Sequence, residues 1–163
     1  MHMDGKTFLL SYILFFISFN TILFSQTKEP ITKKNIDQKI IEALTEWETN
    51  DTSVKIDELI FFIDDNKLKL NNDCSKARVT YLRSIKSIHG KRSVYINYAK
   101  EALELAVNCD DKLIAALCYN LIATSNKFLE PETRNDSLTT NYFHKAIDIF
   151  YQQNKKEYAI DAY

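Results

Sequence analysis

Apolar residues recur at helical spacing along most of the chain from residue 35 onward. One stripe consists of Ile36, Ile40, Leu44 and Trp47, and the next consists of Ile56, Leu59, Ile60 and Ile63. Such spacing places apolar side chains on one face of a helix with 3.6 residues per turn. The pattern therefore predicts two amphipathic helices, with Asn35 and Ser53 as their N-caps and a turn at residues 50–52.

Further helices are predicted over about residues 74–89, 93–108, 111–129 and 137–153, and a short last helix starts near Lys155. Turn-forming residues separate them at Gly90, at residues 108–110 and at residues 131–136. The chain has only two Gly and two Pro, which leaves few residues for tight turns and for strand ends. The predicted fold class is all-α.

The sequence also repeats itself. A shift of 44 residues pairs identical residues: Asn97 with Asn141, Tyr98 with Tyr142, Ala102 with Ala146, Lys112 with Lys156, Ala115 with Ala159, and Tyr119 with Tyr163. A shift of 38 pairs Ala77 with Ala115 and Tyr81 with Tyr119. Stacked helix pairs share a core and keep residues of similar size at their contacts. We assign repeat packing to Ala77, Tyr81, Ala102, Ala115, Tyr119, Ala146, Ala159 and Tyr163, and we interpret residues 130–136 as a loop insertion.

Two segments carry a resemblance to a known family. Residues 98–105, YAKEALEL, resemble the second helix of the tetratricopeptide repeat, with Ala102 at the small-residue position, and residues 119–123, YNLIA, resemble its first helix. Asn126 stands where that family carries an aromatic residue. The resemblance covers about residues 55–163, and it implies a right-handed superhelix of antiparallel helix pairs, an α-solenoid, whose concave face holds a protein or peptide.

The N-terminus has a different pattern. Residues 8–24 form an uncharged apolar run, which follows Lys6 and precedes the small residue Ser25. This layout is typical of a signal peptide over residues 1–25, and the alternative is an uncleaved membrane anchor. We expect a linker at residues 26–34 and a helical repeat domain at residues 35–163, cut off within a helix that would begin another repeat. Both interpretations place the domain outside the cytoplasm, in the periplasm or at the cell surface.

Charge and motifs exclude several function classes. Lys plus Arg total 21 and Asp plus Glu total 22, so no net field attracts nucleic acid or an anionic membrane. The three histidines are His2, His89 and His144, and none has metal-ligand spacing. No phosphate loop, nucleophile elbow or metal-binding helix motif occurs. We therefore predict no enzyme activity, no metal and no cofactor.

The three cysteines are Cys74, Cys109 and Cys118. Cys74 and Cys109 occupy corresponding turns of successive helix pairs. Two unpaired thiols are the favoured interpretation for them, and a disulfide is the alternative if their Cα atoms come within about 7 Å in an oxidising compartment. Cys118 is predicted to be a small core residue beside Tyr119.

The repeat and the absence of catalytic motifs favour a non-catalytic module that binds a protein or peptide partner. Among nine tyrosines, Tyr95, Tyr98 and Tyr142 are the candidates for exposure on a binding face. Contact with a membrane is expected only through the N-terminal segment or through a part beyond residue 163. One alternative is the N-terminal sensor of a bacterial signalling receptor whose histidine kinase or DNA-binding output domain lies beyond this chain. Another is a surface structural subunit that self-associates.

Overall fold

The computed structural model describes residues 29–50 and 54–160 of the chain. In these ranges the regular secondary structure is helical throughout and contains no strand, which confirms the predicted all-α class. The chain divides into two units at Pro30, and the described helices all belong to the second unit. The predicted signal peptide, the Ser53 cap and Tyr163 lie outside the described residues.

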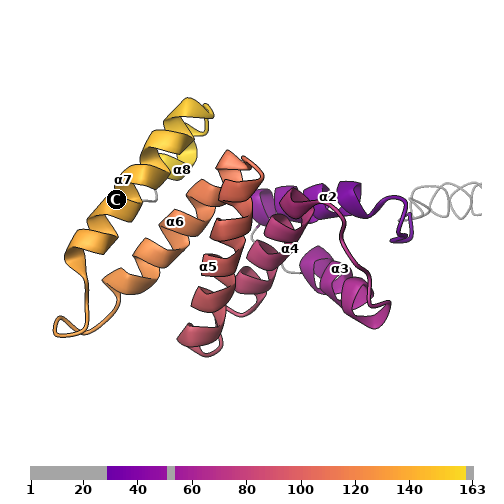
Figure 1. The fold of residues 1–163 in the computed structure, drawn as a ribbon, viewed down its shortest axis with the longest axis horizontal. Coiled ribbons are helices and arrows are strands. Elements are labelled where there is room, and N and C mark those ends of the chain that lie inside the picture. Colours follow the sequence, from indigo (N-terminus) through magenta and orange to yellow (C-terminus); the bar gives the residue numbers. More distant parts are fainter. Residues whose placement is uncertain (1–28, 51–53, 161–163) are drawn as a thin grey trace, which may run out of the picture. The chain divides into compact units, whose positions relative to one another are not determined.

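The helices follow the predicted stripes closely (Figure 1). Their bounds are α2 Ile36–Asn50, α3 Val54–Asp65, α4 Asp73–Lys86, α5 Arg92–Asn108, α6 Lys112–Lys127, α7 Asp136–Gln152 and α8 Lys156–Ile160. The largest difference from the prediction is at the end of α4, which stops at Lys86 rather than near His89. The Ile88 amide bonds the carbonyl of Ile85, three residues earlier, so the α-helical bonding gives way to tighter turns.

Helix starts use the polar residues that precede them. The side chains of Asn72, Asp111 and Asn135 accept hydrogen bonds from the first-turn amides of α4, α6 and α7. These bonds satisfy amides that have no partner within the helix.

Helix ends use left-handed residues that are not glycine. Lys67, Asp110 and Asn154 have φ values of 47°, 59° and 56° and follow α3, α5 and α7. The next amide in each case reaches back to a carbonyl five residues earlier, as from Asp111 to Ala106 at 2.9 Å. This is the Schellman geometry, in which the left-handed position is usually glycine. Here lysine, aspartate and asparagine occupy it, and the left-handed conformation of each costs roughly 1 kcal/mol of stability.

Sequence neighbours among the later helices pack against each other. α4 contacts α5, α5 contacts α6, and α6 contacts α7, and successive helices run in opposite directions (Figure 1). Alanines lie at these contacts: Ala77, Ala102, Ala115 and Ala146 are at most 5% exposed. A side chain this small lets two backbones approach closely, whereas a larger one would separate the helices.

The first two helices join the same core. α2 contacts α3 and α4, and the side chains of Ile40 and Ile56 are completely buried. At one end of α2, Ser75 of α4 donates a hydrogen bond to the carboxylate of Asp37. At the other end, the Lys155 amino group lies 3.9 Å from Glu48. Helix α2 therefore connects α4 with the segment that begins α8.

Asn126 makes a buried polar contact between the end of α6 and the start of α7. The Asn126 amide donates to the Asn135 carbonyl at 2.8 Å and to the hydroxyl of Thr139. Asn126 is 8% exposed and Thr139 is 7% exposed. A buried amide keeps its stability only when its hydrogen bonds are made, so this pair fixes where the 128–135 connection returns to start α7.

Candidate functional site

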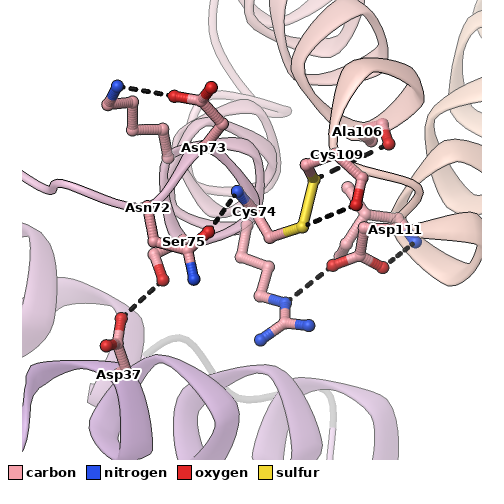
Figure 2. Close-up of a disulfide and its surroundings, with 11 residues drawn as sticks. Asp37, Asn72, Asp73, Cys74, Ser75, Ala106, Cys109 and Asp111 are labelled. Carbon is pink, nitrogen blue, oxygen red and sulfur yellow. Dashed lines mark hydrogen bonds and ion pairs between the residues drawn. A yellow bond between two sulfur atoms is a disulfide. The ribbon is translucent and has the colours of Figure 1, made fainter.

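The sulfur atoms of Cys74 and Cys109 form a disulfide, with their Cα atoms 5.5 Å apart (Figure 2). This corrects the favoured expectation of two free thiols. Cys74 lies in the first turn of α4 and Cys109 directly follows α5, so the antiparallel packing of the two helices brings their cysteines together. Cys118 is free and fully buried. Burial raises the pKa of its thiol, which keeps it in the unreactive protonated form.

An ion pair accompanies the disulfide. Asp111 is the N-cap of α6, where one carboxylate oxygen accepts from the Ile114 amide at 3.2 Å and the other accepts from Arg78 Nε at 2.8 Å. Its side chain is only 8% exposed. Figure 2 shows the carboxylate beside the disulfide. Covalent and ionic links therefore hold the start of α4, the end of α5 and the start of α6 in one place.

Tyr95, Tyr98 and Tyr142, the candidates for exposure on a binding face, are each half-buried. The Tyr95 hydroxyl lies 3.0 Å from the Ser125 hydroxyl, and Arg92 Nε donates to the same hydroxyl oxygen at 2.8 Å. The Tyr95 carbonyl accepts from Ser84 at 2.7 Å. Tyr95 therefore joins α4, α5 and α6 and has its polar groups occupied within the fold.

Tyr142 contacts the predicted packing residue Tyr119. Their ring centroids are 5.1 Å apart in an edge-to-face arrangement, and the Lys145 amino group lies 5.3 Å from the Tyr119 centroid and 5.8 Å from that of Tyr142. Such contacts stabilise both the rings and the cation. Asn120, which follows Tyr119 in sequence, has a buried Oδ1 with no hydrogen-bond partner among the described residues. This cluster joins α6 and α7 and is half-exposed.

Two further tyrosines have raised pKa values. Burial raises the pKa of Tyr81, which is 5% exposed. Burial, followed by a hydrogen bond with Glu48, raises the pKa of Tyr158. Both phenols therefore stay protonated at ordinary pH and cannot serve as proton acceptors. Sequence reasoning missed Glu48 because its partners lie about a hundred residues further along the chain.

An open cleft of about 620 Å³ lies between the α3–α4 connection, α4 and α5. Apolar side chains line it, including Ile63, Val79 and Leu105, together with the cationic residues Lys69, Lys76 and Arg83 and the acidic Glu101. This volume is typical of sites that take a small ligand or a few residues of peptide. Sequence reasoning did not find the cleft because three separate segments line it.

No family model, curated protein or solved structure matches this chain.

The remaining predicted positions are distributed through the core. Ala77, Tyr81, Ala102, Ala115, Ala146 and Ala159 are buried, and Tyr119 is half-buried.

His89 and His144 are exposed. Residues 29–50 and 54–160 contain no group of three or more His, Cys, Asp or Glu residues that could hold a metal ion. Within the same ranges no helix is long and apolar enough to cross a bilayer.

Proposed function

We propose that this chain is a non-catalytic module that binds a protein or peptide partner, built as a right-handed superhelix of tetratricopeptide-like helix pairs. The observation that carries the proposal is the sequential packing of α4, α5, α6 and α7 with buried alanines at repeat-equivalent positions. In a stack of this kind each helix pair packs on its neighbours, and the stack presents a continuous surface for ligands. Its open cleft and its half-exposed tyrosines supply the contact area.

We also propose that the domain works outside the cytoplasm. The disulfide between Cys74 and Cys109 supports this location, because such bonds persist in oxidising compartments and are rare in the cytosol. A fusion of residues 1–34 to alkaline phosphatase, which is active only after export, tests whether these residues direct export. Active fusion protein is the expected result. Activity no higher than that of the phosphatase without residues 1–34 would contradict the location.

Partner isolation tests the binding function. The protein, carrying a C-terminal affinity tag, is recovered from its own host's exported fraction, and any retained protein is purified and titrated back. The expected result is a saturable complex that weakens when Tyr142 is replaced by alanine and is unchanged by Glu104→Ala, a substitution of an exposed residue on α5. Failure to retain any protein, together with turnover on a panel of substrates, would overturn the proposal.

A further inference from the structure

The connection between α3 and α4 contains main-chain groups without partners. After the Schellman bond from Leu68 to Ile63, the amides and carbonyls of Lys69, Leu70 and Asn71 make no hydrogen bond within the described part of the chain. Pairing resumes at Asn72, which caps α4. Figure 1 shows this connection as open coil. Three successive residues therefore offer donors and acceptors to another chain, as the edge of a sheet does.

Burial alternates along the same residues. Leu68 and Leu70 are half-buried and contribute to the core, whereas Lys69 and Asn71 are exposed. A period of two is the signature of an extended chain with one face on the protein. The burial pattern of residues 68–71 therefore matches that of a single unpaired strand with alternate side chains toward the protein.

The connection borders the open cleft. All four residues 68–71 line it, and its apolar lining includes Ile63, Val79 and Leu105. Lys76 is paired with Asp73 at 2.6 Å, and Arg83 is paired with Asp64. Lys69 forms no ion pair in the described ranges, so its charge is available to a ligand.

We propose that an extended peptide binds along residues 69–71 by strand addition, with apolar side chains directed into the cleft and acidic side chains directed toward Lys69. Main-chain hydrogen bonds supply affinity in this mode, and alternate side chains supply specificity. The alternation matches the connection itself, because an acidic residue on the outward face of the added strand lies beside Lys69. The inference rests on the proposed binding function and names the ligand class for one surface.

The probe is a fluorescein-labelled peptide of sequence Val-Glu-Val-Glu-Val with blocked ends, titrated against the exported protein by fluorescence anisotropy. Saturable binding is expected. N-methylation at two alternate amides removes main-chain donors and should weaken binding about tenfold. Replacing both glutamates with lysine should weaken it about fivefold or more. No saturable binding, or equal binding of the N-methylated peptide, would overturn the inference.

Matched variants of the protein test whether the charge of Lys69 contributes to binding and whether the peptide binds at residues 69–71. Lys69→Glu should weaken binding of the acidic peptide about fivefold, whereas Lys156→Glu, at an exposed residue of α8 that does not line the cleft, should not. In two-dimensional NMR the amide signals of residues 69–71 should shift on titration. Shifts confined to Tyr119 and Tyr142 would overturn the inference.

The two proposals can fail separately. If an isolated natural partner binds the Lys69→Glu variant and the original protein equally, and leaves the amides of residues 69–71 unshifted, the strand-addition site is wrong and the binding function stands. If no partner is retained and the protein turns over a substrate of the panel, but the peptide still binds at residues 69–71, the non-catalytic function is overturned and the peptide site stands.

Discussion

The disulfide allows a quantitative prediction about stability. Replacing both Cys74 and Cys109 with serine opens a covalent loop between residues separated by 35 positions in sequence. In the chain-entropy description, a cross-link of this span lowers the entropy of the unfolded chain enough to stabilise the fold by about 3.8 kcal/mol at 25 °C. Stabilities of domains are about 5–15 kcal/mol, so the loss would be a large part of the total.

Urea unfolding followed by circular dichroism at 222 nm measures the loss. With a urea dependence of about 2 kcal/mol per molar, the midpoint should fall by nearly 2 M. The oxidised original protein, the same protein in dithiothreitol and the double-serine variant form the comparison. The reduced protein should match the variant, and the variant should not respond to reductant, because its remaining thiol, Cys118, is buried and unbonded.

The size of the stability loss tests the chain-entropy explanation. A loss below about 1 kcal/mol would refute the chain-entropy reasoning, since it would mean that the loop is already constrained in the unfolded chain. Peptide mapping without reduction provides the matching chemical test: residues 74 and 109 should appear in one cross-linked fragment, and Cys118 should react with alkylating reagent only after unfolding.

Five other substitutions have expected outcomes. Lys67→Gly should raise the free energy of unfolding by about 0.5–1 kcal/mol, because glycine accepts positive φ without strain. Asn154→Gly should raise it by less. An unchanged urea midpoint for Lys67→Gly would contradict this. Asp111→Ala should lower thermal stability by about 1–2 kcal/mol, since it removes an N-cap and an ion pair. Burial raises the pKa of Tyr81 in the folded protein, so the protonated phenol contributes its full stabilisation below the unfolded pKa of about 10. That part of the free energy of unfolding is lost as the pH rises above about 10. Tyr81→Phe should therefore reduce the loss of stability measured by urea unfolding at alkaline pH. Asn126→Ala should cost about 1–3 kcal/mol, measured by calorimetry, by leaving the Thr139 hydroxyl and the 135 carbonyl without this donor.

Local features of the fold could be predicted because their causes are local. The stripe containing Ile36 and Ile40 became α2, and both residues are buried. The recurrence of Ala102 at Ala146 indicated close helix contacts, and both side chains are completely buried. Capping by Asn135 follows the same logic, since a side-chain oxygen and an amide three residues later are brought together by the helix itself.

The exposure of individual tyrosines could not be predicted in this way. Tyr95 and Tyr142 lie on helix faces that a pattern assigns equally well to solvent or to a neighbour. Their partners, Ser125 and Tyr119, are supplied by another helix. The burial of Asn126 likewise depends on another helix, because its amide is satisfied by the Asn135 carbonyl and by the hydroxyl of Thr139.

The sequence by itself determined the helices, their approximate ends and the small residues at their contacts, because periodicity, caps and side-chain volume act over a few residues. Only the tertiary structure decided that Cys74 bonds Cys109, that Glu48 lies beside Lys155, and that a cleft opens beside Lys69. These features join segments far apart in the chain. Their distances depend on how each helix packs on the next, and no short stretch of sequence contains that information.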